Sequence, residues 1–306
     1  MSDKYSYKCS ILVLLYNKGV CESNTLNSLL ISKLKFEDCK LVVWNNGPNQ
    51  IKFENYETLI NMGFDISFIE TVDNESLAKV YNKFINLFIA RRYLILDDDS
   101  VLNDIYLKKA LESDQQKLTI PIITNHGITQ GPFVDGVVYT EGKFTKVKHS
   151  IVAVGSGLII GHGVIDLLLN HYGSIFDDRF YLYGVDSTFF KRINNLKLFN
   201  NIEVIQGFEH SFSRLEIENP DTIKFRKKER TYDIALTNIF YNESEVNSLF
   251  FVFNTIIRSF VKELIGIKSD VIISAFIYAS LKRKHYRYSA DKDLKQIDYD
   301  FSHKPE

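Results

Sequence analysis

The first hundred residues alternate short apolar runs with segments of helical character, and this alternation limits the possible folds more than any other feature of the chain. The runs are CSILVLL, KLVVW, FDISFI and RYLIL, and a helix-like segment, SLAKVYNKFINLF, separates the last two. Buried parallel strands read as continuous Val, Ile and Leu runs, and parallel neighbours need a long crossover, usually a helix. The pattern therefore predicts an α/β fold with a Rossmann-like, mostly parallel sheet flanked by helices.

Polar residues follow three of these runs at their carboxyl ends. Tyr16 and Asn17 follow the first run, Asn45 and Asn46 follow the second, and an acidic triplet at 97–99 follows the fourth. In open parallel sheets, ligands bind outside the carboxyl ends of the strands. The sequence therefore predicts that these three strand ends face one ligand.

The acidic triplet consists of Asp97, Asp98 and Asp99, three like charges that are costly to bury without a cation. An EF-hand loop counted from Asp97 would need Glu at its twelfth position, where Lys108 stands, and the chain has no GxxxxGK phosphate loop. Two interpretations remain. The triplet is either a solvated turn ahead of a helix that begins near residue 103, or a site where Asp97 and Asp99 hold one divalent cation.

Composition limits the classes of partner. With 45% hydrophobic and 25% charged residues in 306, the chain has the composition of a soluble globular protein, and its formal net charge of -1 gives no attraction to nucleic acid. The three cysteines show no CxxC spacing, which indicates reduced thiols and a cytoplasmic setting. We expect neither an export signal nor a membrane-spanning helix, because no apolar stretch of about 18 residues occurs.

Five stretches in order resemble the family-2 glycosyltransferases of the GT-A fold, in particular the bacterial rhamnosyltransferase-like branch that builds surface polysaccharides. They are LLYNKG, VVWNNGP, NESLAKVYN, LDDDS, and GSGLIIG followed by FDDRFYLYGVD, and they lie within residues 9–215. Ser76 stands where this family usually has Gly, Asn45 where it commonly has Asp, and Val185 where it usually has Glu. The resemblance implies a GT-A type fold and a nucleotide-sugar donor.

The same resemblance implies a set of donor-site residues on the matching stretches. The nucleotide-sugar-binding residues would be Tyr16, Asn17, Asn45, Asn46, Asn74, Ala78, Asn82, Asp97 and Asp98. A Mn2+ or Mg2+ ion would be held by Asp97, Asp99 and His210. Each assignment has a structural alternative, because Asn is a common turn former and a lone His is more often part of a core.

On the acceptor side, the resemblance implies Asp186 as the catalytic base and Gly155, Ser156 and Gly157 as acceptor-binding residues. A base is needed to take the proton of the acceptor hydroxyl as it attacks the sugar. The alternatives are that Asp186 is the N-cap of the helix STFFKRI, and that the two glycines allow a tight strand crossing. Asp177 and Asp178 are interpreted as structural.

The expected organisation has four parts. Residues 1–100 form the nucleotide-sugar-binding half, 101–215 the acceptor-binding and catalytic half, 216–245 a polar linker or mobile loop, and 246–306 amphipathic basic helices. Residues 246–288 hold seven Lys or Arg against two Asp or Glu, a local net charge of +5. The helices would cover the core, form a homodimer interface, or contact the cytoplasmic face of a membrane.

The sequence thus predicts an inverting, metal-dependent glycosyltransferase (hexosyltransferase). Its donor would be dTDP-rhamnose or a UDP-sugar, and its acceptor a glycan or polyprenyl-linked oligosaccharide of O-antigen or capsule synthesis. One rival is a catalytically silent nucleotide-sugar or glycan-binding domain, suggested by Ser76 and Val185. The other is a sugar nucleotidylyltransferase, although the first strand lacks the Gly-, Arg- and Lys-rich loop that such enzymes use.

Overall fold

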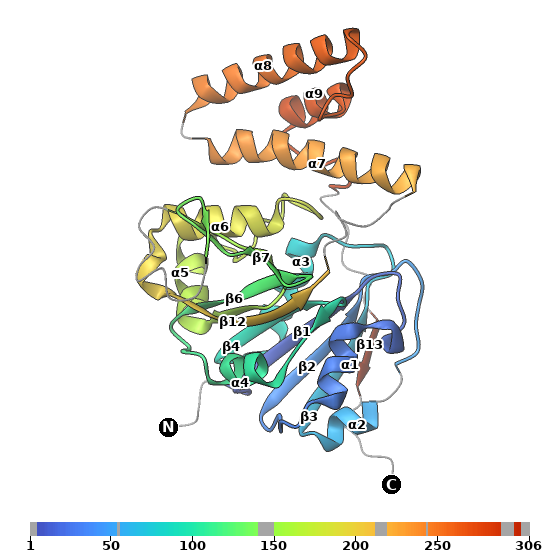
Figure 1. The fold of residues 1–306 in the computed structure, drawn as a ribbon, viewed down its shortest axis with the longest axis vertical. Coiled ribbons are helices and arrows are strands. Elements are labelled where there is room, and N and C mark those ends of the chain that lie inside the picture. The colour runs from blue at the N-terminus through green and yellow to red at the C-terminus, as the bar shows by residue number, and fades with distance from the viewer. Residues whose placement is uncertain are drawn as a thin grey trace.

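A mixed ten-stranded sheet forms the centre of the protein. The computed structural model describes residues 5–53, 56–139, 150–211, 219–242, 244–288 and 297–300. The sheet order within these ranges is β13-β3-β2-β1-β4-β11-β6-β12-β5, with β7 paired to β6 (Figure 1). The strands are β1 Cys9–Leu15, β2 Cys39–Asn45, β3 Phe64–Glu70, β4 Arg92–Asp97, β5 Ser100–Val101, β6 Leu118–Asn125, β7 Ile128–Gly131, β11 Leu158–Gly161, β12 Ile202–His210 and β13 Ile297–Asp300.

Four parallel strands, in the order β3-β2-β1-β4, make up the Rossmann-like half. The register places Asn45 opposite Leu15 and Asp97 opposite Leu14, so the polar ends of these strands meet at one edge. Strand order reverses direction between β1 and β4, the kind of switch point at which open α/β sheets bind ligands. The expected fold class, a Rossmann-like α/β sheet with a helical C-terminal extension, is confirmed and is consistent with the GT-A type.

Helices cover both faces of the sheet, which is why its strands read as continuous apolar runs. One face packs against α1 Asn24–Ile31, α2 Tyr56–Asn61 and α4 Asp104–Glu112, and the other against α3 Leu77–Leu87, α5 His162–Tyr172 and α6 Val185–Asn195. Successive residues of β1 alternate between the two cores, with Ile11 and Val13 in one and Leu12 and Leu14 in the other. Short 3-10 turns occur at Val20–Glu22 and Leu198–Asn201.

The second half of the sheet departs from parallel pairing. β11 runs antiparallel between β4 and β6, and β12 returns parallel to β6 before its last two residues pair antiparallel with β5. This last pairing sets His210 opposite Ser100, next to the acidic triplet. A small separate sheet has the strand order β10-β8-β9, with β8 at Phe133–Val134, β9 at Val137–Val138 and β10 at Ile151–Val152.

A long helix, α7 Pro220–Tyr241, occupies most of the segment for which the sequence predicts a polar linker or mobile loop over 216–245. That prediction is wrong for residues 220–241. Asn219 accepts a hydrogen bond from the backbone N–H of Thr222, and Pro220 takes the first helical position, so the helix has a well-formed start. The polar sequence hides a few apolar residues: Tyr232 and Ala235 pack with α9, and Leu236 packs into the core on the α6 side of the sheet.

The C-terminal extension contains α8 Glu245–Leu264 and α9 Ile273–Lys282, stacked on α7 away from the sheet (Figure 1). We call α7, α8 and α9 together the helical unit. In the described part of the chain no helix has the length and hydropathy needed to cross a membrane. The prediction of helices over 246–306 does not hold at 297–300, where β13 pairs antiparallel with β3 and forms the edge strand on that side of the sheet. The division of the chain into a donor half and an acceptor half stays a prediction.

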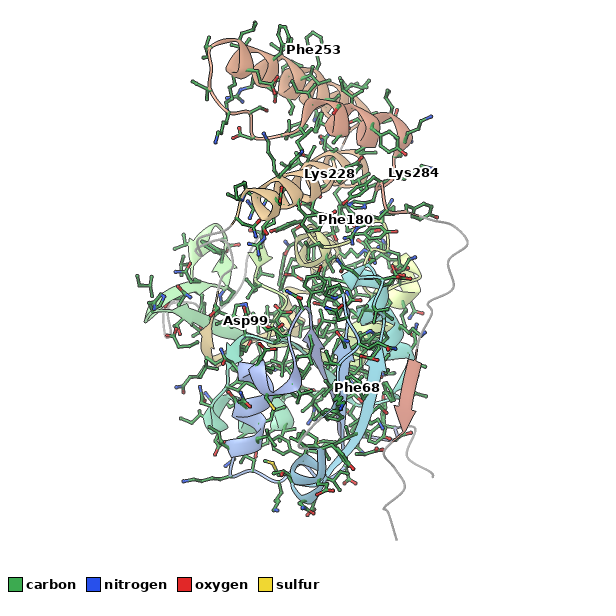
Figure 2. The ribbon with its side chains drawn as sticks, turned by 90° about the vertical axis from the view of Figure 1, so that its right-hand side faces the viewer. Phe68, Asp99, Phe180, Lys228, Phe253 and Lys284 are labelled. Carbon is green, nitrogen blue, oxygen red and sulfur yellow. The ribbon has the colours of Figure 1, made fainter. Side chains whose placement is uncertain are left out.

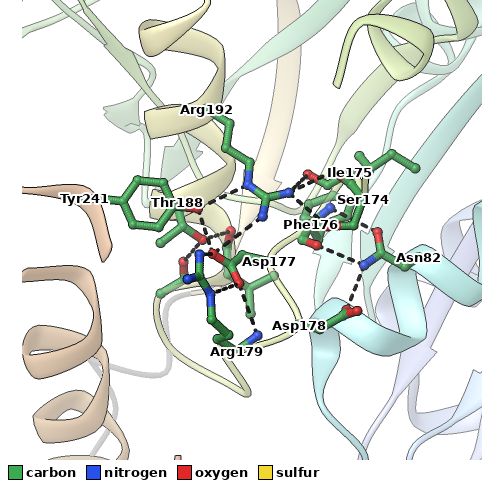
Figure 3. Close-up of polar contacts among 12 residues, drawn as sticks. Asn82, Ser174, Ile175, Phe176, Asp177, Asp178, Arg179, Thr188, Arg192 and Tyr241 are labelled. Atoms are coloured by element: carbon green, nitrogen blue, oxygen red, sulfur yellow. Dashed lines mark hydrogen bonds and ion pairs between the residues drawn. The ribbon is translucent and has the colours of Figure 1, made fainter. Parts of the chain in front are cut away.

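A buried polar network fastens the helical unit to the sheet domain (Figure 3). Asp177 binds Arg179 through both of its oxygens and accepts a hydrogen bond from the Tyr241 hydroxyl at 2.8 Å. Arg192 lies 3.5 Å from the same carboxylate and donates to Tyr241. Burial by itself raises the pKa of Asp177, but the hydrogen bonds and positive charges around it bring the pKa below its ordinary value. The structural interpretation of Asp177 is consistent with these contacts.

Candidate active site

The acidic triplet and His210 form one cluster at the carboxyl edge of the sheet. Asp97, Asp99 and His210 each offer a ligand atom, and these three atoms lie within 4.8 Å of one another. Nδ1 of His210 lies 3.2 Å from a carboxylate oxygen of Asp99, and Nε2 lies 4.0 Å from one of Asp97. The three sequence-predicted metal ligands are therefore brought together by the pairing of β12 with β5.

The backbone of the triplet is fixed from below by helix α1. Thr25 donates from its hydroxyl to the carbonyl of Asp97, and Ser23 donates to the carbonyl of Asp98 at 3.0 Å. Thr25 also accepts from the N–H of Ser100. These bonds fix the backbone of the turn that carries the three carboxylates.

Charge is concentrated at this cluster. Burial among protein atoms and the negative charges of Asp99, Asp186 and Asp98 raise the pKa of Asp97 well above its ordinary value, although 41% of its side-chain surface still reaches solvent. Burial lowers the pKa of His210 to about 4, so this imidazole is neutral at physiological pH. In a neutral imidazole one of the two ring nitrogens carries a lone pair, which can bind a metal.

These residues fit a hard divalent cation. Two neighbouring carboxylates and a neutral histidine are donors that Mn2+ accepts, and carboxylates also suit Mg2+. The same crowding of negative charge is unfavourable without a cation. The chemistry of the donor set therefore supports the predicted ligands Asp97, Asp99 and His210, while the identity of the ion is left open.

Asp98 has a different partner from its two neighbours. Lys18, in the loop after β1, lies 2.6 Å from the carboxylate of Asp98, and the backbone N–H of Tyr16 points at the same group at 3.4 Å. The triplet is thus divided: Asp98 ties the ends of β1 and β4 together, and Asp97 and Asp99 face His210. A direct contact of Asp98 with a nucleotide stays a prediction.

Asp186 lies beside the cluster, at the second position of α6. The N-cap of α6 is Gly184, so the alternative interpretation of Asp186 as an N-cap is wrong. Gly155 donates its backbone N–H to Asp186 at 2.9 Å, and a Cβ at position 155 would lie 2.3 Å from the other oxygen. Burial, opposed by this hydrogen bond and assisted by the charge of Asp233, raises the pKa of Asp186 to about 6. The close approach explains why position 155 is Gly.

Ser156 and Gly157 support the site from within the protein. Ser156 is 2% exposed, and its hydroxyl accepts a hydrogen bond from the N–H of Asp97. The Ser156 hydroxyl also lies 3.0 Å from the Ser100 hydroxyl. Gly157 has φ +88°, and a Cβ there would lie 2.7 Å from Phe208. Both positions thus serve the packing behind the triplet, and acceptor binding by Gly155, Ser156 and Gly157 stays a prediction.

Asn45 and Asn46, at the end of β2, are buried and use their amides within the protein. Asn45 donates to Glu70 and to the carbonyl of Asn49, and its oxygen accepts from Gly47. Asn46 donates to the carbonyl of Glu75 and accepts from Thr71 and from the N–H of Glu75. Their contacts are those of turn residues, as the alternative interpretation has it, and recognition of a base by these amides remains untested.

Tyr16 and Asn74 form the more open part of the predicted donor site. Tyr16 is 47% exposed, and its hydroxyl accepts from the Asn74 amide at 3.4 Å. Asn17 and Asn74 both have positive φ, +54° and +53°, which fits their places in tight turns. An exposed aromatic ring beside the strand ends is suited to stacking on a flat ligand.

Two other predicted donor-site residues lie in the interior. Ala78 has no exposed surface and belongs to the core beneath α3. Asn82 is buried, donates to the carbonyl of Phe176 and to Asp178, and accepts from the N–H of Phe176 (Figure 3). Their contacts hold α3 against the loop before α6, and a role in donor binding stays a prediction.

Three residues at the site were missed by sequence reasoning. Lys18 follows a strand end by three residues, a position where a cation beside the triplet could have been suspected. Ser100 adjoins the triplet, but its contact with His210 at 3.1 Å depends on a pairing between distant strands. Asp233 lies in the segment taken for a linker, so nothing in the sequence pattern indicated that its charge acts on Asp186.

Comparisons with known proteins come from solved structures. No protein-family model matches the sequence, and no curated protein matches it. A crystal structure of S. aureus TarS shows 16% identity and a TM-score of 0.45, covering 78% of this chain and 41% of that chain. TarS 1–349 in complex with UDP shows 17% identity and a TM-score of 0.45, and the match covers 78% of this chain and 68% of that chain. TarS 1–349 in complex with UDP-GlcNAc shows 16% identity and a TM-score of 0.44, and the match covers 78% of this chain and 69% of that chain. The chain thus spans less than half the length of the first TarS structure.

Proposed function

We propose that this protein is a metal-dependent glycosyltransferase that moves a sugar from a nucleotide donor to a hydroxyl group of its acceptor. The observation that carries the proposal is the cluster of Asp97, Asp99 and His210, with ligand atoms within 4.8 Å of one another, beside a carboxyl group, Asp186, whose pKa is about 6. A cation site and a separate base next to it are what transfer from a nucleoside diphosphate requires.

The positions of these residues support the following roles. Asp97, Asp99 and His210 would hold a divalent cation, which when bound supplies a positive charge for the departing diphosphate. Asp186 would accept the proton of the acceptor hydroxyl as the new C–O bond forms and the bond to the diphosphate breaks. A single displacement of this kind inverts the anomeric centre. With a pKa of about 6, Asp186 is ionised at neutral pH yet remains a stronger base than an ordinary aspartate.

The identity of the two substrates rests on the resemblance of the five sequence stretches. Within the rhamnosyltransferase-like branch, the donor would be dTDP-rhamnose, and a hexose from a UDP-sugar is the second choice. The acceptor would be a glycan or polyprenyl-linked intermediate of a surface polysaccharide, O-antigen or capsule. Tyr16 would stack on the base, and the exposure of its ring at the strand ends supports this role.

A thermal-shift panel tests this function. The purified chain is heated with UDP, dTDP, GDP and their sugars, each with and without Mn2+, and donor hydrolysis is then followed for the nucleotide that binds. We expect one nucleoside diphosphate to raise the melting temperature only with the metal, and the matching donor to be slowly hydrolysed. Binding without hydrolysis or transfer would favour the silent domain, and no binding of any nucleotide would contradict the proposal.

A further inference from the structure

Helix α8 has two apolar faces, and only one of them is covered. The inner face, which includes Val252 and Ile256, packs on α7 and α9. The outer face is formed by residues that recur at helical spacing and are 44–75% exposed: Val246, Leu249, Phe250, Phe253, Ile257, Phe260, Val261 and Leu264. We call these eight residues the outer stripe.

The outer stripe is continuous and carries no charge. At 100° per residue its members fall within an arc of about 120°, and every residue of α8 in that arc is apolar. The stripe spans 19 residues, which at 1.5 Å per residue is about 27 Å. Figure 2 places Phe253 at the outer end of the molecule, with α7 and its Lys228 between α8 and the body that contains Asp99. An uncovered apolar surface of this size is typical of an interaction site.

Basic residues gather near the C-terminal end of α8. Lys224, Lys227 and Lys268 line a hollow of about 760 Å³ between the start of α7 and the turn that joins α8 to α9, together with a single acidic residue, Glu263. Leu264, Ile265 and Ile267, all at least half exposed, lie next to this hollow in the chain. Residues 246–288 carry a net charge of +5 in a chain whose total is -1, so the positive charge is local to this end.

We propose that the outer stripe and the three-lysine hollow bind the surface of an anionic phospholipid bilayer. The stripe lies in the interface with its apolar side chains among the acyl chains, and the lysines contact headgroup phosphates. A second copy of the chain is the less favoured occupant, because a dimer through this face would bring together two segments 246–288 that each carry a net charge of +5, and like charges repel. This proposal stands independently of the proposed function, since it depends on no residue of the candidate active site.

Co-flotation of the full chain with lipid vesicles tests the proposal. Vesicles of phosphatidylcholine alone are compared with vesicles that contain about 30% phosphatidylglycerol. The stripe variant is Phe250→Gln, Phe253→Gln and Phe260→Gln, and the charge variant is Lys224→Gln, Lys227→Gln and Lys268→Gln. The matched control replaces three equally exposed aliphatic residues of the body, Ile31, Ile128 and Val137, by Gln.

We expect the wild type and the control to float with the anionic vesicles and to be released by high salt. The stripe variant should lose binding by about 100-fold or more, and the charge variant by a similar factor on anionic vesicles only. Circular dichroism checks folding, and if the Gln variant unfolds, Ala at the same three positions replaces it, because Ala favours the helix. The proposal would be overturned if the wild type stays unbound or if the variants bind as well as the wild type. It would also be overturned if the wild type is a dimer that binds no vesicles and the stripe variant is a monomer.

Discussion

The sheet domain and the helical unit differ in how far their apolar residues are buried and in the sign of the charge that they concentrate. In the sheet domain both faces of the central strands are covered by helices, and the charges converge on one edge, at Asp97, Asp99 and Asp186. In the helical unit a whole face of α8 is exposed, and residues 246–288 carry a net charge of +5. The first arrangement is suited to chemistry on a small ligand, and the second to contact with a large surface.

The difference indicates that a ligand site and a docking surface have different structural requirements within one chain. A site that holds a cation needs side chains fixed by hydrogen bonds, as the turn at 97–99 is fixed by Thr25 and Ser23. A docking surface needs exposed apolar area more than fixed geometry. Each of the following experiments should therefore affect one region and leave the other intact, or should act on the junction between them.

The largest effect is expected for Asp186→Asn. The variant keeps an oxygen that can accept from Gly155 but cannot take a proton, so transfer should fall by about 10² to 10⁴-fold while donor affinity stays within a few-fold. Steady-state transfer and calorimetric donor binding measure the two quantities. Vesicle binding serves as the control for the helical unit. Near wild-type turnover in the variant would exclude Asp186 as the base.

Asp99→Ala should remove the metal dependence of donor binding. Loss of one of two carboxylate ligands is expected to weaken metal-dependent affinity by about 100-fold, within the range found when charged hydrogen-bonded groups are removed. Asp166→Ala, an exposed aspartate on α5, is the matched control. Calorimetry with and without Mn2+ gives the result, and equal affinities in both conditions would contradict the metal assignment.

Glu229→Gln acts on the junction, because Arg287, which contacts Glu229, also donates to the carbonyl of Asn74 in the sheet domain. Glu229 has a fully buried carboxylate that contacts Arg287 at 3.2 Å, His285 at 3.4 Å and the Tyr286 hydroxyl at 2.7 Å. Removing one member of such a buried pair typically costs about 3 kcal/mol or more. Thermal unfolding should show this loss, and limited proteolysis should cut between the two regions sooner. Glu263→Gln on α8 is the control, and an unchanged melting temperature for Glu229→Gln would argue against the junction.

The pH profile distinguishes the base from the rest of the site. Since burial raises the pKa of Asp186 to about 6, transfer should rise through pH 6 and fall about tenfold for each unit below it. A carboxyl group with a raised pKa favours the folded state at low pH and loses that contribution as pH increases through 6. The stability of Asp186→Asn relative to wild type should therefore increase between about pH 4 and pH 7 and stay constant at higher pH. A flat rate profile across this range would contradict the assignment.

The smallest effect is expected for Asp233→Asn. The charge of Asp233 contributes to the raised pKa of Asp186, so its removal should move the midpoint of the pH–rate profile downward by less than one unit. The maximum rate should change little, because Asp233 does not touch the metal ligands. Thr237→Val, which removes the hydroxyl that bonds Asp233 at 3.0 Å but keeps the charge, is the control. An upward shift would contradict the expected sign.

The sheet could be read from the sequence because local pattern determines it. The apolar runs of β1, β2 and β4 are long and uninterrupted, and the alternation of strands with helices is typical of parallel pairing. The helix at 220–241 was missed because its apolar positions are few and lie among charged residues, so only packing against α9 and α6 reveals its face. β13 was missed because a short polar strand becomes a strand through the edge that it pairs with.

The candidate site could be predicted in part. Asp97, Asp99 and His210 were identified together, although their proximity depends on the β12–β5 pairing, which no local pattern encodes. Asn45, Asn46 and Asn82 were placed at the donor because they lie on stretches that resemble the family's donor-site motifs. Burial, which decides how they use their amides, is a property of the folded chain and cannot be read from residue type.

Asp233 gives the two regions a thermodynamic connection. It belongs to α7, a Cβ at Gly184 would lie only 2.4 Å from its carboxylate, and its charge acts on Asp186. A displacement of α7 on the sheet domain would therefore alter the proton affinity of Asp186. Linkage is reciprocal, so protonation of Asp186 must in turn change the free energy with which the helical unit holds its position.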